Sequence, residues 1–256
     1  MELNQEELKA FLDEKVQQYN HPSFIEKDPI SVPHAYSKKE DIEISGFFAA
    51  TIAWGNRKSI LTNATKLMER MDHAPHDFIM NHTKADLDVF DGFVHRTFQE
   101  ADVKYFAQRL QQLYMEFRSL EKVFTPQVNA VHMHDVLIDF HNLFFAIPHQ
   151  KRTKKHVANP AKKSAAKRLH MFLRWMVRND NAGVDLGIWK NISPRLLSCP
   201  LDVHSGNVAR ALGLLKRKQN DLAAVQELDA TLRTLDPNDP VKYDFALFGL
   251  GVFEGF

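Results

Sequence analysis

The sequence predicts an all-α fold, and three observations lead to this. Apolar residues recur at helical spacing along most of the 256 residues. Helix-start patterns precede several of these stretches, and no run alternates apolar and polar residues between turn signals. Hydrophobic residues make up 44% and charged residues 25% of the chain, which is typical of a globular protein. This composition excludes a wholly disordered, collagen-like or coiled-coil chain.

The N-terminal half is expected to hold five helices. Asn4 with Glu7 is a capping-box pattern that begins the first, and Ser37 with Glu40 begins the second. Thr125 before Pro126 is an N-cap followed by proline at the first helical position, which predicts the start of the fifth. The approximate ranges are 4–19, 37–54, 60–68, 102–119 and 125–145.

The C-terminal half is expected to hold four more helices. Between Leu169 and Val177 the apolar residues fall at i, i+3, i+4, i+7 and i+8, which indicates an amphipathic helix. Asp239 before Pro240 is an N-cap pattern for the last helix. The approximate ranges are 169–177, 203–212, 222–235 and 239–250.

A basic segment separates the two halves. Residues 149–168 contain eight Lys or Arg and no acid, although the whole chain has a net charge of only +1. Such a patch would release counterions from a phosphate backbone on binding. The alternative is a solvated loop whose lysines only confer solubility.

The remaining composition limits the classes of site and compartment. Cys199 is the only cysteine, which excludes an intrachain disulfide, a four-cysteine zinc site and a cysteine-held iron–sulfur cluster. The acidic N-terminus lacks an apolar signal core, and no apolar run approaches the length of a membrane span. We therefore expect a cytoplasmic protein with no membrane association.

The segment Pro200-Leu-Asp202-Val-His204, followed by Arg210 and Leu212-Gly-Leu214, resembles the Asp-bearing segment of the helix-hairpin-helix DNA glycosylases. That superfamily includes endonuclease III and the 8-oxoguanine glycosylases. The resemblance implies that Asp202 stabilises oxocarbenium-like charge at the sugar C1′ and activates a nucleophile. The simpler interpretation is a helix N-cap, and the two do not exclude each other.

The same resemblance implies that Lys167 is the nucleophile that attacks C1′ in bifunctional members. The order of basic loop, lysine, amphipathic helix and aspartate is that of the superfamily. The gap of 35 residues to Asp202 is nearest to the archaeal 8-oxoguanine glycosylases. The hairpin departs from the pattern, because Asn159-Pro160-Ala-Lys-Lys-Ser stands where a glycine-rich turn would approach a phosphate. The alternative for Lys167 is a solvated basic residue.

The resemblance also implies contacts to DNA and to a flipped base, with no metal and no cofactor. A polar residue at the turn after residues 47–54 would fill the gap that the flipped base leaves. The residues expected to contact nucleic acid are Asn56, Arg57, Lys162, Lys163, Arg168, His204 and Arg210. The residues expected to line a base pocket are Trp54, Tyr243 and Phe248, for each of which packing in the core is the alternative.

Nearly the whole chain resembles an uncharacterised bacterial family, the conserved domain of unknown function DUF2400. Four segments carry the match, beginning at Ala50, Arg168, Pro200 and Asp239. The link to glycosylases implies one unit of two helical subdomains that flank a DNA-binding cleft. The expected ranges are 1–50 with 200–256 for one subdomain and 51–199 for the other. Double-stranded DNA is the expected partner, and no obligate protein partner is inferred.

Two other functions stay open from the sequence. The degenerate hairpin fits a non-catalytic member of the same fold that binds nucleic acid or another partner. The pattern His132-Met-His134-Asp135, with His95 upstream, suggests a helical His/Asp metal phosphohydrolase. On a continuous helix His132 and His134 would point about 200° apart, which argues against a shared metal.

Overall fold

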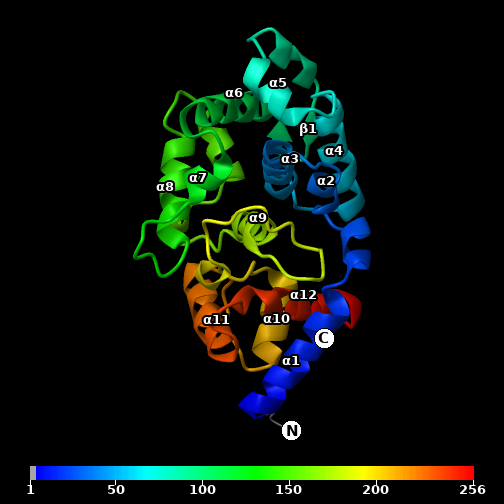
Figure 1. The fold of residues 1–256 in the computed structure, drawn as a ribbon, viewed down its shortest axis with the longest axis vertical. Coiled ribbons are helices and arrows are strands. Elements are labelled where there is room, and N and C mark those ends of the chain that lie inside the picture. Colours follow the sequence, from blue (N-terminus) through cyan, green and yellow to red (C-terminus); the bar gives the residue numbers. More distant parts are fainter. Residues whose placement is uncertain (1–3) are drawn as a thin grey trace. The chain divides into compact units, whose positions relative to one another are not determined.

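The computed structural model describes residues 4–256, which form twelve α-helices, several 3₁₀ turns and one short hairpin (Figure 1). The helices are α1 Gln5–Tyr19, α2 Ser31–His34, α3 Lys39–Thr51, α4 Arg57–Glu69, α5 Pro75–Asn81, α6 Glu100–Phe117, α7 Leu120–Phe124, α8 His134–Phe144, α9 Lys167–Val177, α10 Val203–Ala211, α11 Leu222–Leu235 and α12 Tyr243–Phe253. The predicted all-α class is confirmed. None of the helices in residues 4–256 has the length and apolar character needed to cross a bilayer.

The hairpin pairs β1 Val94–His95 with antiparallel β2 Phe98–Gln99 and was not expected from the sequence. Each strand has only two residues, which is too short to show period-two alternation. Arg96 turns the chain between them with a φ of 54°. His95 and Phe98, which are paired in the register, are both buried, so the hairpin is fixed by its inner face.

The chain divides into two compact units. Unit 1 comprises residues 1–24, 126–137 and 159–256, and unit 2 comprises residues 25–125 and 138–158. These bounds differ from the expected subdomains, which grouped 25–50 with the C-terminal helices and 159–199 with the middle ones. The reason is packing: α3 pairs with α2, α4 and α5, whereas α1 is the N-terminal helix that packs on α12. The glycosylase arrangement itself stays a prediction.

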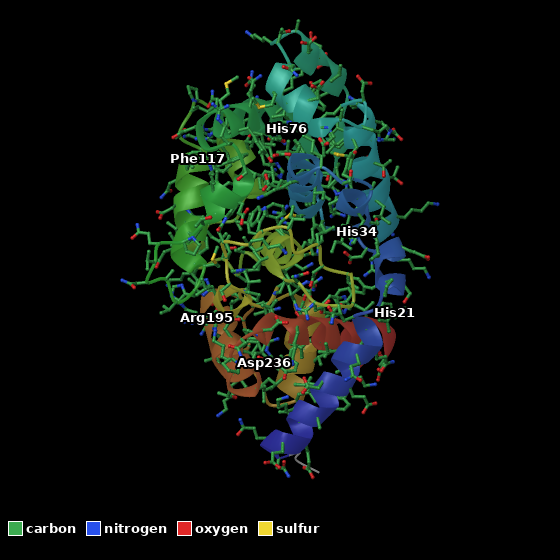
Figure 2. All side chains as sticks on the ribbon, in the orientation of Figure 1. His21, His34, His76, Phe117, Arg195 and Asp236 are labelled. Carbon is green, nitrogen blue, oxygen red and sulfur yellow. The ribbon has the colours of Figure 1, made fainter. Side chains whose placement is uncertain are left out.

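The core of unit 1 forms where α12 packs against α1 and α10 (Figure 1). α12 is apolar on almost every side, so most of its residues are buried. Leu12 and Val16 of α1, Val208 of α10 and Leu228 of α11 complete this apolar cluster. Asp236, labelled in Figure 2, is the C-cap of α11. Its side chain accepts hydrogen bonds from the backbone N–H groups of residues 238 and 239 and so stabilises the turn that follows the helix.

Replacing Gly249 in this core by a larger residue is expected to destabilise the protein. A Cβ at this position of α12 would lie 2.1 Å from a ring carbon of Tyr19 in α1. We expect Gly249→Ala to destabilise the protein by about 1–3 kcal/mol, the usual effect of overpacking. Gly251→Ala is the comparison, because it gains the same helix propensity while its Cβ would lie 3.1 to 3.2 Å from His204 and Val208, so we expect it to lose less stability than Gly249→Ala. Urea unfolding of both variants tests this, and equal stabilities would contradict the packing described here.

The core of unit 2 is built from phenylalanines. The rings of Phe47, Phe106 and Phe144 contact one another with centroids between 4.8 and 5.8 Å apart. Phe140, one turn before Phe144 in α8, also contacts this cluster, and Phe98 connects it to the hairpin. These rings are all buried, and edge-to-face contacts predominate, as expected for packed aromatic side chains.

Several predicted helix starts are confirmed and others are wrong. The Asn4–Glu7 capping box is present. Ser37 is not an N-cap; α3 begins after Lys38 with no side-chain cap. Thr125 is not a helix start but the C-cap of α7, where its hydroxyl donates to the carbonyl of Glu121. The next helix begins only at His134. The last segment starts as a 3₁₀ turn, Pro240–Lys242, before α12.

Candidate active site

Lys167 and Asp202 lie side by side in unit 1. The Nζ atom of Lys167 is 3.6 Å from Oδ2 of Asp202, and 29% and 24% of the two side chains are exposed. This is the adjacency that the resemblance implied for a nucleophile and its carboxylate. The pair is 35 residues apart in the sequence, so it is assembled by the fold and not by local structure. A partly exposed amine beside a carboxylate can reach a bound substrate and exchange a proton.

Asp202 is held by a capping box at the start of α10. Its Oδ1 accepts hydrogen bonds from the backbone N–H groups of His204 at 2.8 Å and Ser205 at 3.0 Å. Its own N–H donates to Oγ of Ser205 at 2.9 Å. The cap therefore occupies one carboxylate oxygen and leaves Oδ2 for Lys167. Both interpretations of the sequence, helix cap and site carboxylate, fit the same side chain.

Arg210 is connected to the backbone of Asp202 through the side chain of Asn220. Its guanidinium donates to the side-chain oxygen of Asn220 and, at 2.7 Å, to the carbonyl of Arg217. The amide of Asn220 donates in turn to the carbonyl of Asp202 at 2.8 Å. Gly206 leaves room for these groups, since a Cβ there would lie 2.8 Å from Asn220. Arg210 was expected to contact nucleic acid, which stays a prediction; in the structure it supports the turn at Asp202.

Lys167 is the first residue of α9, and the chain before it is bent sharply. Ala166 adopts the left-handed region with a φ of 47° and is buried. Its N–H donates to Oγ of Ser164 at 3.2 Å. The carbonyl of Lys163 accepts from the N–H of Leu222, which ties the segment to the start of α11. Non-glycine residues are uncommon at positive φ, so this bend is a constrained feature that directs Lys167.

Asp244 is a buried carboxylate that acts electrostatically on the pair. It lies in α12 and forms an ion pair with Arg174 of α9. Burial raises the pKa of Asp244 to about 6, the charge of Arg174 opposes this rise, and the charge of Asp202 adds to it. The Sγ atom of Cys199 lies 3.7 Å from Asp244, and burial raises the pKa of this thiol well above its usual value. The thiol is therefore protonated at neutral pH.

The buried network around Arg174 could not be predicted from the sequence. The apolar stripe of α9 predicted one buried face, but every residue from Leu169 to Val177 is buried. Arg174 therefore lies inside, with Nε 3.1 Å from Asp185, and Arg178 contacts the same carboxylate at 3.2 Å. The only indication in the sequence was that Arg174 and Arg178 are four residues apart in a strongly apolar segment. Their acidic partners lie on other segments and could not be paired from the sequence.

The other residues predicted to contact nucleic acid are spread over both units. Lys162 and Lys163 are exposed and His204 is exposed at the first turn of α10. Arg168 follows Lys167, and burial lowers the pKa of its guanidinium to about 10, so it stays charged at neutral pH. In unit 2, Asn56 is the N-cap of α4 and accepts from the N–H of Ser59 at 3.2 Å. Arg57 is the first residue of α4.

The three predicted base-pocket residues are divided between the two units. The ring of Tyr243 is fully buried in the core of unit 1, so it has no exposed face for a base. Phe248 packs edge-on against Phe24 at 5.9 Å, which is a packing contact. Trp54 belongs to unit 2, where it stacks on His156 at 5.8 Å and meets His95 edge-on at 5.0 Å.

The histidines considered for a metal site are arranged differently from the expectation. His132 precedes α8, so its ring is not on the opposite face of a helix and lies 4.5 Å from the ring of His134. The ring of His134 in turn lies 5.7 Å from that of His170. Within residues 4–256 no three His, Cys, Asp or Glu side chains gather in a way that could hold a metal ion.

His134 and His170 make the stability of unit 1 pH-dependent. Burial, with the nearby charges of His132 and Arg233, lowers the pKa of His134 to about 4, and burial, with His134, lowers that of His170 to about 3. Neither ring nitrogen of His170 has a hydrogen-bond partner. A folded-state pKa below the unfolded value means that the unfolded state takes up the proton first. The free energy of unfolding is therefore unaffected by His170 above pH 6.5 and decreases as the pH falls from 6.5 toward 3.

We expect His170→Leu to lose less stability than the wild type between pH 7 and pH 5, by about 2 kcal/mol. Asp229 and Asp244 act in the opposite sense, because burial raises the pKa of each to about 6. The wild-type profile therefore mixes both effects, and the difference between variant and wild type isolates the histidine. Urea unfolding at the two pH values measures it, and parallel profiles would show that His170 does not titrate on unfolding as described.

Comparisons with known proteins give one match. The family described as "Protein of unknown function (DUF2400)" matches residues 28–253. The match includes Lys167, Asp202 and all of the residues that hold them. No curated protein and no solved structure matches the chain significantly.

Proposed function

The chain belongs to the DUF2400 family of proteins of unknown function, and we propose that it is a DNA glycosylase that removes a damaged base. The observation that carries the proposal is the approach of the Lys167 amine to within 3.6 Å of the Asp202 carboxylate. An amine and a carboxylate in this relation are the two groups that base excision through an imine requires. The order of these residues in the chain is that of the helix-hairpin-helix glycosylases.

The proposed reaction begins with a damaged nucleotide turned out of the duplex. The Lys167 amine, after giving up a proton, attacks C1′ of the sugar. The N-glycosidic bond breaks, and the base leaves with the bonding electron pair and takes up a proton. Oδ2 of Asp202 stabilises the positive charge that develops on the sugar, while Oδ1 stays bound to the cap of α10. If Lys167 instead only pairs with Asp202, the carboxylate activates water and the enzyme is monofunctional.

Phosphates of the duplex are proposed to bind near the start of α9. The N-terminus of α9 has no side-chain cap at Ala166, and the N-terminal end of a helix attracts anions. Lys162 and Lys163 are exposed just before it. They take the role that the backbone of a glycine-rich hairpin has in the superfamily.

A lesion panel tests the proposal. Duplex oligonucleotides that each contain one damaged base are incubated with wild-type protein or with Asp202→Asn, and alkali then reveals abasic sites as strand breaks. We expect a break at one class of lesion with the wild type only. If the wild type makes no break on a broad panel but binds the duplexes, the protein is a non-catalytic binding member of the fold.

A further inference from the structure

The basic segment is divided between the two units, and its first half is fixed to unit 2 by one buried carboxylate. Residues 151–156 form a 3₁₀ turn, η3 Lys151–His156. The side chain of Asp102, in the first turn of α6, has no exposed area. It accepts from Arg152 at 2.7 Å and from the hydroxyl of Thr153 at 2.7 Å, and His156 lies 3.4 Å away. A segment that looked like a solvated loop in the sequence thus has a specific anchor.

The pKa of Asp102 shows how firmly this carboxylate is kept charged. Burial alone raises the pKa, but the nearby ring of His156 and the hydrogen bonds from the N–H of Gln99 and the hydroxyl of Thr153 lower it to about 2. The group is therefore a fixed negative charge at any physiological pH. It compensates the charge of Arg152.

Two other loops of unit 2 are joined to η3 at the same place. Arg152 donates to the carbonyl of Thr97 in the hairpin loop at 2.6 Å. His95 of the hairpin lies 3.2 Å from the carbonyl of Trp54, and Trp54 stacks on His156. The turn after α3, the β1–β2 loop and η3 are thus linked through their side chains.

These three loops carry exposed positive charge and few acids. Arg96 lies at the tip of the hairpin and crosses the turn at Gly55, where a Cβ would lie 2.8 Å from its guanidinium. Gly55 has a φ of 100°, so both its space and its conformation favour glycine here. Lys151, Lys154 and Lys155 are exposed on η3, and no ion pair of residues 4–256 uses them. We define Arg96, Lys151, Lys154 and Lys155 as the basic face of unit 2.

We propose that the basic face of unit 2 binds the phosphate backbone of double-stranded DNA, with Asp102 as the residue that positions it. The choice of DNA as the polyanion rests on the proposed function, whereas the face itself does not include Lys167 or Asp202. The anchor matters for binding. Ordering a flexible loop on DNA would cost backbone entropy, and a segment that is already fixed loses less of it. The half-buried ring of Trp54 lies at the edge of this face, beside the joint of the three loops.

The test is binding of an undamaged labelled duplex, measured by fluorescence anisotropy over a series of salt concentrations. Replacing Lys151, Lys154 and Lys155 together by Gln is expected to weaken binding at least about tenfold at low salt. It should also make the slope of log K against log salt shallower by about 1 for each lysine that contacts a phosphate. The matched control replaces Lys27, Lys84 and Lys122, three exposed lysines elsewhere on unit 2, by Gln. The control changes the net charge equally and should keep the wild-type slope.

Thr153→Val tests the positioning role of Asp102 without changing any charge. The variant removes one hydrogen bond to the carboxylate. We expect it to weaken binding several-fold although all the lysines are present, and to lower the melting temperature without unfolding the protein at the assay temperature, because Arg152 and the N–H of Gln99 still donate to Asp102. The proposal is overturned if the triple lysine variant and its control have equal slopes, and the positioning role is overturned if Thr153→Val binds as the wild type does. Base excision is not measured here, so loss of the proposed enzymatic function would leave this result intact.

Discussion

Asp202→Asn is expected to reduce the rate of base excision by about 10² to 10⁴, the usual contribution of a positioned catalytic carboxylate. Asparagine is a good N-cap, so Oδ1 can still accept from the first turn of α10. What the variant loses is the negative charge at Oδ2, which lies 3.6 Å from the Lys167 amine. Single-turnover kinetics on the lesion found in the panel measure the rate.

The control for this variant is Asp221→Asn. Asp221 is also an N-cap, at the start of α11, and its side chain accepts from the N–H of Ala224 at 3.1 Å. Its carboxylate pairs with Arg217 and not with Lys167. We expect Asp221→Asn to keep the wild-type rate. Equal rates for wild type and Asp202→Asn would mean that Asp202 only caps its helix.

Arg174→Met is expected to give the largest loss of stability, about 3–5 kcal/mol, because removing one partner of a buried ion pair leaves its carboxylates uncompensated. Arg174 is 3% exposed and contacts both Asp185 and Asp244. Urea unfolding at pH 7.5 measures the loss. The matched control is Arg217→Met, because the pair of Arg217 with Asp221 is at the surface and should contribute little.

The loss in Arg174→Met should shrink as the pH falls. Burial already raises the pKa of Asp185 and Asp244, and removing the positive charge of Arg174 raises both further. The folded variant therefore binds more protons than its unfolded state in mildly acidic solution, so acid stabilises it relative to the wild type. A loss that is the same at pH 5 and pH 7.5 would contradict the assignment of these carboxylates as the buried, uncompensated groups.

The sequence predicts the helices well where local signals determine them. Asn4 and Glu7 are three residues apart and make their capping box without help from the rest of the chain. The same reasoning fails at Thr125 and Pro126, where a local pattern was read as a helix start. There the Thr125 hydroxyl completes the end of α7, and α8 begins eight residues after Pro126. A pattern of two residues does not say which of two neighbouring helices it serves.

The candidate site was predictable only in part. Asp202 and Lys167 could be proposed because their order resembles a known superfamily. Of the two supports of Asp202, Arg210 lies in α10 within the segment that resembles the superfamily, whereas Asn220 lies in a loop whose sequence carries no motif. The anchoring of η3 by Asp102 pairs residues about 50 apart. Such contacts depend on how helices pack, and a periodicity of apolar residues does not encode them.

Borohydride trapping tests the central claim, an imine between Lys167 and the sugar, most directly. Duplexes with an abasic site or with 8-oxoguanine are incubated with wild type, Lys167→Gln and Asp202→Asn in the presence of the reductant. We expect a covalent protein–DNA adduct with the wild type, its loss in Lys167→Gln, and a much weaker adduct in Asp202→Asn. An adduct that persists in Lys167→Gln, or no adduct with the wild type, would contradict the assignment of Lys167 as the nucleophile.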